Sequence, residues 1–348
     1  MKREATMRAA VLYGREDVRV EDVRRPAPGH GEVLIRVGVA LTCGTDLKVY
    51  RRGYHARMLT PPAVFGHEMA GVIEEVGEGV EGWEPGTAVV APNSAPCGVC
   101  EYCRARREAL CDDLLFWSGA YAQFVCLPAR VVKLNMLDVP PRTSLRTAAL
   151  VEPLACAVRG VEKSRVRSGE VVAVIGAGSL GLMLLQLLRR EGARVVVAGR
   201  RPEGLAVAED LGAESVVSAT RGELTEQLLA LSPGGRGFSL VIEAVGREQT
   251  TAAALKVVRK GGRLNLFGGC AAGTIVQADA QRLHYEEVEV FGTFHHTPTS
   301  VRKALQLLRR GEIDADTYIR REILLDQIPG VFAELLRGRG FLKCSVTP

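Results

Sequence analysis

The segment 171–201, VVAVIGAGSLGLMLLQLLRREGARVVVAGRR, constrains the possible folds of this chain more than any other. Its apolar run Val171–Ile175 is typical of a buried parallel strand. A glycine-rich turn follows, then an apolar, helix-forming stretch, Leu180–Arg190, and a second strand, Arg194–Ala198. Because parallel strands need a crossover of this kind between them, the segment predicts an α/β domain built on a doubly wound parallel sheet.

The turn in this segment has the spacing of a dinucleotide-binding motif, G-x-G-x-x-G. Gly176 permits the tight turn, Gly178 lets the backbone approach a pyrophosphate, and Gly181 lets the helix pack against the strand. The helix N-terminus, at Ser179 and Leu180, offers unpaired N–H groups to phosphates. A glycine-rich turn in an ordinary α/β domain is the alternative, but the flanking strand and helix favour cofactor binding by these five residues.

Composition and charge narrow the class of protein. The chain has 348 residues, which suggests two domains, and 47% of them are hydrophobic. The net charge is +5 without a dense basic run interleaved with aromatics, so we expect no nucleic-acid partner. The N-terminus lacks the pattern of a signal peptide, and no apolar run is long enough to span a membrane. We therefore expect a cytoplasmic protein with no membrane partner.

The N-terminal part of the chain differs in periodicity from the segment described first. Residues 7–40 and 64–90 alternate short apolar runs with charged or glycine-marked turns, which is typical of antiparallel β structure. Two more short strands are predicted within Tyr121–Val132, and a helix is predicted over Leu145–Val161. This part of the chain is therefore expected to form a β-rich domain of its own.

From Val171 onward, strands alternate with amphipathic helical stretches. The predicted strands are Val171–Ile175, Val195–Ala198, Ser215–Val217, Leu240–Ile242, Arg263–Leu266 and Val288–Phe291. Six strands in this rhythm predict a doubly wound sheet. After Gly292 we predict a helix over Ser300–Arg310 and a short β-like tail ending at Phe341–Lys343, which returns to the first domain.

Four of the nine cysteines lie within a short segment, spaced C-x2-C-x2-C-x7-C at Cys97, Cys100, Cys103 and Cys111. In a cytoplasmic chain such clustering favours metal binding over disulfides. Four thiolates can surround one ion tetrahedrally, as in structural zinc sites. An iron–sulfur cluster or free thiols are the alternatives. We favour zinc, because the segment lies in a β-rich region beside a dinucleotide domain without another redox motif.

A second set of potential metal ligands is scattered along the sequence. Cys43 lies in TCGTD, His67 and Glu68 lie in FGHEM, and Glu152 lies in LVEPLA. One thiolate, one imidazole and one or two carboxylates suit an open catalytic zinc site. The residue types alone are weak support, since a lone cysteine is more often a core residue and Glu68 could be an ion-pair partner.

These motifs together resemble the zinc-dependent medium-chain dehydrogenases/reductases, especially the sorbitol-, polyol- and threonine-dehydrogenase-like branch. The resemblance covers nearly the whole chain. Its motifs are CGTD at Cys43–Asp46, GHE-x2-G at Gly66–Gly71, GEGVEGWEPGTAV at Gly77–Val89, the four-cysteine segment, EPLA at Glu152–Ala155 and GAGSLG at Gly176–Gly181.

The resemblance implies a particular domain organisation and assembly. A GroES-like β-rich catalytic domain is expected over residues 1–156, with a structural zinc lobe at about 93–115, and a Rossmann domain over 157–293. Residues 294–348 are expected to return to the catalytic domain. A homotetramer is implied, with a dimer as the alternative.

The resemblance also implies a catalytic zinc held by Cys43 and His67, with Glu68 or Glu152 as the third protein ligand. The implied reaction oxidises an alcohol to a ketone: zinc lowers the pKa of the bound hydroxyl, and hydride passes to the nicotinamide. A zinc-free reductase or a non-catalytic dinucleotide-binding protein on the same fold is the alternative of another class.

Two residues of the segment after Cys43 are candidates for proton transfer. Thr45 stands where the family keeps a serine or threonine that passes the substrate proton onward, although it could also cap a helix. At Lys48 the family often has a histidine that continues the relay. A lysine there could relay protons or bind a charge on the cofactor or substrate.

The end of the second strand of the dinucleotide domain indicates which nicotinamide is used. NAD-binding domains place Asp or Glu about 20 residues beyond the glycines, to bind the ribose hydroxyls. Here Gly199 occupies that position, and Arg200 and Arg201 follow. The missing carboxylate removes repulsion of a 2′-phosphate, and guanidinium groups bind phosphate. We predict that NADP is preferred over NAD; a solvated turn is the alternative.

Further cofactor contacts are expected where later strands end, because ligands bind at the carboxyl ends of parallel strands. The predicted contacts are Ala244, Val245, Phe267, Gly268, Gly269, Phe291, Gly292 and Thr293, with Lys343 in the tail. The expected partner is a small-molecule alcohol or ketone: a polyol, sugar or related secondary alcohol, with threonine and simple secondary alcohols as alternatives. Residues expected to line its pocket are Thr45, Tyr50, His67, Phe116, Trp117, Glu152 and the pair His295–His296. The two histidines could bind a polyol or could simply end the sixth strand.

Overall fold

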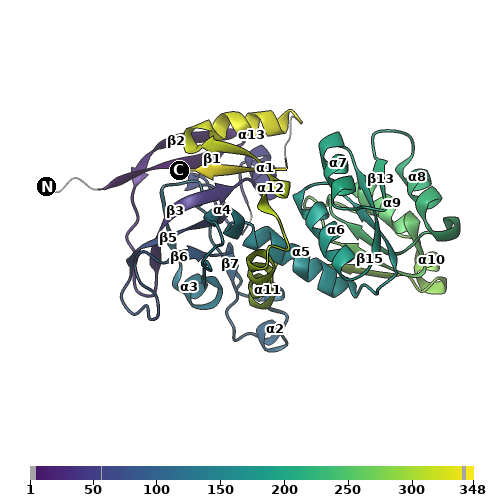
Figure 1. Cartoon of the computed structure of the whole chain (residues 1–348), viewed down its shortest axis with the longest axis horizontal. Coiled ribbons are helices and arrows are strands. Elements are labelled where there is room, and N and C mark those ends of the chain that lie inside the picture. The colour runs from purple at the N-terminus through teal and green to yellow at the C-terminus, as the bar shows by residue number, and fades with distance from the viewer. Residues whose placement is uncertain (1–4, 56, 339–341) are drawn as a thin grey trace. The chain divides into compact units, whose positions relative to one another are not determined.

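The computed structural model describes residues 5–55, 57–338 and 342–348 of the chain, which divides into two compact units. The first unit combines both ends of the chain, Met1–Ala155 and His296–Pro348, and the second is Cys156–His295. Figure 1 shows the purple N-terminal and yellow C-terminal segments together in the first unit, and the green segments in the second. Among the described residues, no helix combines the length and apolar character that crossing a membrane requires.

Antiparallel sheets dominate the first unit. A small sheet has the order β2-β1-β4, and a larger one has the order β10-β6-β5-β3-β18-β17, with β9 also paired to β3. The strands are β1 (Thr6–Gly14), β2 (Asp17–Arg24), β3 (Val33–Leu41), β4 (Ala63–Val64), β5 (Glu68–Val76), β6 (Ala88–Val90), β9 (Phe124–Leu127), β10 (Leu137–Asp138), β17 (Ile319–Leu324) and β18 (Lys343–Thr347). Their alternating apolar residues form one core around Phe65, Tyr121 and Phe332.

Helices and one small hairpin complete the first unit. The helices are α1 (Gly44–Arg52), α2 (Glu101–Arg104), α3 (Ala129–Asn135), α4 (Leu145–Ala148), α11 (Pro298–Arg309), α12 (Ala315–Tyr318) and α13 (Ile328–Leu336), with single turns η1 (Glu108–Leu110) and η3 (Leu325–Gln327). The hairpin pairs β7 (Ser94–Ala95) with β8 (Leu115–Phe116). Helix α5 (Val151–Ser164) begins in the first unit and ends in the second.

The prediction of two strands within Tyr121–Val132 is wrong in its second half. Strand β9 ends at Leu127, and α3 begins directly after Pro128. Pro128 is the N-cap of α3, and because proline has no N–H it cannot continue the hydrogen-bonded ladder of β9. The valines of α3 are buried among the core residues, so a β-branched pair was mistaken for a strand.

The C-terminal segment completes the larger sheet of the first unit. Strand β18 pairs antiparallel with β3, Ser345 opposite Leu41, and parallel with β17. The expected return of the tail to the first domain is therefore observed from Lys343 onward, whereas Phe341 lies outside the described residues. This pairing places residues near the end of the chain beside the segment that precedes α1.

The second unit is a six-stranded, wholly parallel sheet of order β13-β12-β11-β14-β15-β16, which confirms the predicted doubly wound fold. Its strands are β11 (Val171–Ile175), β12 (Arg194–Gly199), β13 (Ser215–Ser218), β14 (Phe238–Glu243), β15 (Val258–Leu266) and β16 (Glu289–Gly292). Its helices are α6 (Ser179–Arg190), α7 (Pro202–Asp210), α8 (Leu224–Leu231), α9 (Glu248–Val257) and α10 (Ala280–Tyr285), with the turn η2 (Pro233–Gly235). The order reverses beside β11, which opens the crevice that binds ligands in such sheets.

Candidate active site

The predicted ligands Cys43 and His67 meet in the first unit, together with Glu68. Cys43 precedes α1 as its N-cap, and its Sγ accepts a hydrogen bond from the Thr45 amide at 3.4 Å. Glu68 is the first residue of β5, and His67 directly precedes it. The ligand atoms of Cys43, His67 and Glu68 all lie within 4.8 Å of one another. A thiolate, an imidazole and a carboxylate so close together form a donor set that suits a catalytic zinc ion.

A buried carboxylate orients His67. The Nδ1 atom of His67 lies 2.8 Å from Oδ1 of Asp46, whose side chain is fully buried in the first turn of α1. The hydroxyl of Tyr121 lies 2.6 Å from the other oxygen of Asp46 and 3.0 Å from the carbonyl of Leu41. When Nδ1–H donates to a carboxylate, Nε2 keeps the lone pair with which a histidine binds metal. The two partners of Asp46 therefore fix both the position and the tautomer of His67.

Electrostatics at these residues follow from burial and from the neighbouring charges. Burial acts to lower the pKa of His67, but the Asp46 carboxylate and the Cys43 thiolate outweigh it and raise this pKa well above its ordinary value. Burial, and next the charge of Glu68, raise the pKa of the Cys43 thiol. A bound cation would offset the negative charge of Glu68 that helps to raise the pKa of Cys43.

Glu68 has a cationic partner from the other end of the chain. The Nζ atom of Lys343, at the start of β18, lies 2.5 and 2.8 Å from the two carboxylate oxygens of Glu68 and 3.0 Å from the carbonyl of Thr42. The Lys343 and Glu68 side chains are 3% and 0% exposed. The sequence predicts that Lys343 binds cofactor. Its ammonium group instead contacts the carboxylate of Glu68, a predicted metal ligand of the first unit.

Glu152 lies in the first turn of α5 and is 7% exposed. Burial, the largest influence, raises the pKa of its carboxyl to about 7, while His67 lowers this pKa and Glu68 raises it. Both carboxylates that the sequence offers as third ligand are therefore buried near His67, and only Glu68 lies within the tight group with Cys43.

The other predicted site residues of the first unit have varied positions. Thr45 is half-buried at the second position of α1, and Lys48 is exposed one turn further on. Cys43, not Thr45, caps this helix. Tyr50 packs its ring against Phe332 in the core, with ring centroids 5.4 Å apart, so it does not line an open pocket.

Two more of the expected pocket residues are buried in the interior of the first unit. The indole of Trp117 donates to the carbonyl of Pro92 at 2.8 Å, and this side chain is 5% exposed. His296 is also buried, with Nε2 3.3 Å from Oδ1 of Asn93 and 3.5 Å from Oγ of Ser94. Its neighbour His295 adopts a left-handed backbone conformation, φ 63°.

The four clustered cysteines converge on one point, and their sulfur atoms all lie within 4.8 Å of one another. The Sγ atoms of Cys97 and Cys103 are 3.9 Å apart, and ligands about 2.3 Å from one tetrahedral zinc ion would be separated by about 3.8 Å. The amide groups of Val99 and then Cys100 donate to Cys97 Sγ and lower its pKa to about 6. Cys97 therefore favours the thiolate, the form that binds metal, whereas burial raises the pKa of Cys103 to about 12 and also raises the pKa of Cys111.

The dinucleotide turn in the second unit requires its first and third glycines. Gly176 has a φ of 129°, and a Cβ atom on Gly181 would lie 1.7 Å from the carbonyl oxygen of Gly176. Around Gly178, by contrast, a Cβ atom would meet nothing within 4 Å. Ser179 and Leu180 open α6 directly after this turn. The turn thus leaves its middle glycine and the N-terminus of α6 open to a phosphate group.

The strand end that distinguishes the two nicotinamide cofactors has no room for an acidic side chain. Gly199 ends β12, and a Cβ atom there would lie 2.5 Å from Cβ of Ala177. Arg200 is exposed, and Arg201 is the half-buried N-cap of α7. Among the described residues, neither guanidinium group forms an ion pair.

A buried carboxylate that the sequence analysis missed shapes the turn after β14. The oxygens of Glu243 accept hydrogen bonds from the amides of Val245 and Gly246 at 2.9 and 3.0 Å, and from Thr250 Oγ1 at 2.7 Å. A Cβ on Gly246 would lie 2.3 Å from the carbonyl oxygen of Gly269, so the turns after β14 and β15 pack closely. The sequence signal that could have identified Glu243 is an acidic residue at the end of the apolar strand β14.

The remaining predicted cofactor contacts also lie at the carboxyl ends of the parallel strands. Ala244 follows β14, Phe267 and Gly268 follow β15, and Phe291 and Gly292 end β16. The last predicted contact is buried: Thr293 donates from Oγ1 to Oδ1 of Asn265 at 2.9 Å. The structure thus collects the predicted contacts of the second unit along one edge of the sheet, as the doubly wound topology requires.

Comparisons with known proteins agree with this geometry. Residues 29–136 match the family described as alcohol dehydrogenase GroES-like domain, and residues 179–310 match zinc-binding dehydrogenase. The chain belongs to the zinc-dependent medium-chain dehydrogenase/reductase family. It is a dehydrogenase, and its two units contain the GroES-like and Rossmann-type parts of the family fold.

Relatives within the medium-chain family differ in substrate. The chain is 27% identical to a sorbitol dehydrogenase of Bacillus subtilis strain 168, covering 98% of this chain and 97% of that protein. It is 31% identical to an L-threonine 3-dehydrogenase of Pyrococcus abyssi, covering 91% and 90%. Among solved structures, the alcohol dehydrogenase of Thermus sp. ATN1 is 30% identical, with a TM-score of 0.88 and coverage of 98% and 99%. A protein of Sinorhizobium meliloti 1021, solved bound to NADP, is 29% identical, with a TM-score of 0.88 and coverage of 99% and 100%.

Proposed function

We propose that this medium-chain dehydrogenase interconverts a secondary alcohol and a ketone on a polyol, sugar or related small molecule, and that NADP is its preferred hydride acceptor. The observation that carries the proposal is the group formed by half-buried Cys43 with buried His67 and Glu68, whose ligand atoms lie within 4.8 Å of one another. The sorbitol and threonine dehydrogenases among its relatives support the substrate class, since both names describe oxidation at an alcohol.

Cys43 and His67, with Glu68 or Glu152, would hold the catalytic zinc ion, which when bound lowers the pKa of a coordinated hydroxyl. Asp46 keeps the His67 ring oriented through the 2.8 Å hydrogen bond to Nδ1. The choice between the two carboxylates is testable, because replacing the true ligand by glutamine removes a bond to the metal. We expect one of Glu68→Gln and Glu152→Gln to weaken zinc binding far more than the other in a chelator competition assay.

Proton transfer is proposed for Thr45 and Lys48 of α1. Residues three apart on a helix lie on the same face, and these two lead from the half-buried start of α1 to its exposed surface. The Thr45 hydroxyl would accept the substrate proton, and Lys48 would return it to solvent. Lys48→Ala should change the pH dependence of kcat/KM; an unchanged profile together with unchanged Michaelis constants would remove Lys48 from this role and from binding a charge on cofactor or substrate.

The NADP preference is proposed from Gly199, Arg200 and Arg201. The close approach of Gly199 to Ala177 leaves no space for the acidic side chain that binds the ribose of NAD. The two guanidinium groups, without ion-pair partners among the described residues, suit a 2′-phosphate. Wild type should have a higher kcat/KM with NADP than with NAD, and Arg200→Ala/Arg201→Ala should reduce the NADP value about 10–100-fold while sparing NAD. Equal use of both cofactors by the wild type would sink this part of the proposal.

A substrate screen combined with metal analysis tests the proposed function as a whole. The zinc-loaded enzyme should reduce NADP with at least one member of a panel of polyols, sugars, amino alcohols and simple secondary alcohols, and should contain two zinc ions per chain. His67→Ala should retain the ion at the four-cysteine loop and lose both the other ion and the activity. One zinc in the wild type, with no oxidation of any alcohol, would favour a reductase or a non-catalytic binding protein.

A homotetramer with a cytoplasmic location is proposed, with a dimer as the alternative. Strand β16 lies at the end of the parallel sheet, and its Val290 is 38% exposed. An exposed edge strand can pair with the same strand of a second copy. None of the nine cysteines, all of which the structure describes, forms a disulfide, and this suits a reducing compartment. Light scattering of the purified chain would measure the assembly directly.

A further inference from the structure

Two adjoining cavities lie in the second unit, at the amino ends of its parallel strands. The smaller, about 380 Å³, opens beside Val171 at the start of β11 and Ser239 near the start of β14. The larger, about 890 Å³, shares Pro233 and Arg259 with it. Cofactors of doubly wound sheets bind at the opposite, carboxyl ends of the strands. These cavities are therefore separate from the dinucleotide turn.

Cations dominate the lining of the larger cavity, which includes Arg236, Lys256, Arg259, Lys260 and Arg282. The acidic residue of this lining is Glu286, and its carboxylate already forms ion pairs with Arg282 at 2.9 Å and with Lys260 at 3.9 Å. Arg282 also donates to the carbonyls of Leu255 and Val258, which fixes the end of α9 and the start of β15. Among the described residues, Arg236, Lys256 and Arg259 form no ion pair.

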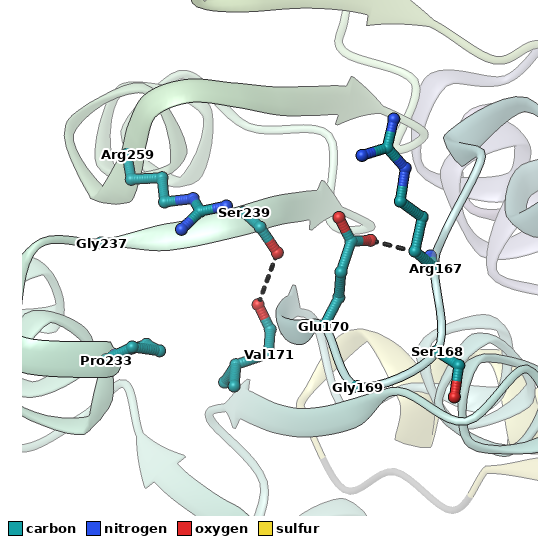
Figure 2. Close-up of a pocket in the computed structure, with 9 residues that line it drawn as sticks. All are labelled: Arg167, Ser168, Gly169, Glu170, Val171, Pro233, Gly237, Ser239 and Arg259. Atoms are coloured by element: carbon teal, nitrogen blue, oxygen red, sulfur yellow. Dashed lines mark hydrogen bonds between the residues drawn. The ribbon is translucent and has the colours of Figure 1, made fainter.

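The smaller cavity extends this basic surface. Figure 2 shows the guanidinium of Arg259 beside Ser239, with Glu170 between Arg259 and Arg167. The carboxylate of Glu170 is neutralised by Arg263, whose Nη2 lies 2.6 Å from both of its oxygens, and it also accepts from the Arg167 amide at 2.9 Å. Because Glu170 is paired with Arg263, Arg167 and Arg259 keep the smaller cavity basic, and Arg259 also lines the larger one.

Like charges gathered in a concave surface raise the local potential and attract anions. Size and composition then limit what the anion can be. A volume of about 890 Å³ lies within the range of roughly 300–1,000 Å³ that is typical of small-molecule sites. The described lining residues of the two cavities include no aromatic side chain, so nothing there would stack on a base. Arginine and lysine are the side chains that bind phosphate.

We propose that the joined cavities form a second ligand site, which binds a compact small molecule carrying two or more phosphate groups. Arg236, Lys256 and Arg259 contact the phosphates directly, and Arg282, held by Glu286 and the carbonyls at the end of α9, keeps the wall in place. This site lies on the far edge of the sheet from the cofactor and binds its ligand whether or not a nicotinamide is present.

Calorimetric titration with tripolyphosphate tests the proposal. The zinc-loaded, full-length enzyme is first saturated with NADP, so that the probe cannot bind through the cofactor's phosphate contacts. We expect one tripolyphosphate per chain, and about 10–100-fold weaker binding to Lys256→Ala/Arg259→Ala, since each substitution removes a charge-assisted hydrogen bond. The matched control is Arg221→Ala, an exposed arginine of the same unit that forms no ion pair among the described residues; it should change the affinity by less than about twofold.

Several results would overturn the proposal. They are the absence of binding by the wild type, equal affinity of wild type and double variant, or equal weakening by Arg221→Ala, which would indicate attraction to net charge alone. Tighter binding of a short DNA duplex than of tripolyphosphate would assign the surface to a nucleic acid instead. Circular dichroism and an unchanged KM for NADP would establish that the double variant is folded, so that a loss of binding reports on the site.

Discussion

Replacing Tyr121 by phenylalanine tests whether the buried partners of Asp46 support the proposed zinc site. The Tyr121 hydroxyl lies 2.6 Å from one Asp46 oxygen, and His67 Nδ1 lies 2.8 Å from the other. Tyr121 and Asp46 are both 0% exposed, so water does not replace a lost hydrogen bond. Hydrogen bonds to charged groups contribute about 1.5–3 kcal/mol, and we expect the free energy of unfolding to fall by about 2 kcal/mol.

The same substitution should weaken zinc binding, because the freed Asp46 oxygen no longer holds the carboxylate against His67. Mutations of groups that orient a metal ligand typically reduce metal affinity about 10–100-fold, and we expect Tyr121→Phe to fall within this range. Competition with a chromophoric chelator measures the affinity, and urea denaturation of the zinc-free protein measures the stability. Because the four-cysteine loop is proposed to hold an ion of its own, the loss should concern one zinc ion per chain.

Tyr50→Phe is the matched control. Tyr50 is also buried in the first unit, at 6% exposure, but its ring packs against Phe332 and its hydroxyl forms no hydrogen bond among the described residues. Its substitution should change the free energy of unfolding by less than about 0.5 kcal/mol, as is usual away from buried polar contacts. If both variants lose the same stability and zinc affinity is unchanged, then the Asp46 network does not support the metal site.

Three further predictions concern buried charges and the loop cysteines. Lys343→Met should lower the free energy of unfolding by about 3–5 kcal/mol in urea denaturation, because it leaves the Glu68 carboxylate buried and unpaired. Adding Glu68→Gln should recover part of this loss, and the absence of any recovery would contradict the pairing of Lys343 with Glu68. Glu243→Gln should raise the KM for cofactor about tenfold, since an amide is a weaker acceptor for the turn after β14; steady-state kinetics would show an unchanged KM if that turn does not contact cofactor. After zinc removal, alkylation of Cys97 should rise through about pH 6 and then level off, whereas Cys126, whose pKa burial raises to about 12, should react slowly throughout; peptide mapping measures both, and equal rates would refute the difference.

Features with a local physical cause could be predicted closely. The close contact between Gly181 and the Gly176 carbonyl tolerates no side chain, and the apolar strand β11 is buried. Both features can be recognised from residues that are neighbours in the sequence. The four clustered cysteines are likewise close in the sequence, and their convergence follows from short spacers. The valines after Pro128 show the limit of such reasoning, because a short β-branched run satisfies a buried helix as well as a strand.

Contacts between distant segments could not be predicted in this way. Tyr121 reaches Asp46 only because β3 and α1 place the Asp46 carboxylate beside the Tyr121 ring. Lys343 was predicted to bind cofactor, whereas the pairing of β18 with β3 places its ammonium group beside the Glu68 carboxylate. Nothing in the neighbourhood of either residue in the sequence encodes its partner.

The sequence by itself determined the two kinds of domain, the dinucleotide turn and the four-cysteine loop, because spacing and periodicity are local properties of a chain, whereas Cys43 and His67 were predicted only through the family resemblance. The tertiary structure alone decided which groups surround those residues: Asp46 and Tyr121 behind His67, Lys343 on Glu68, and the basic cavities around Arg259. The physical reason is that hydrogen bonds and ion pairs act over a few ångströms in space, whatever the separation of their partners along the chain.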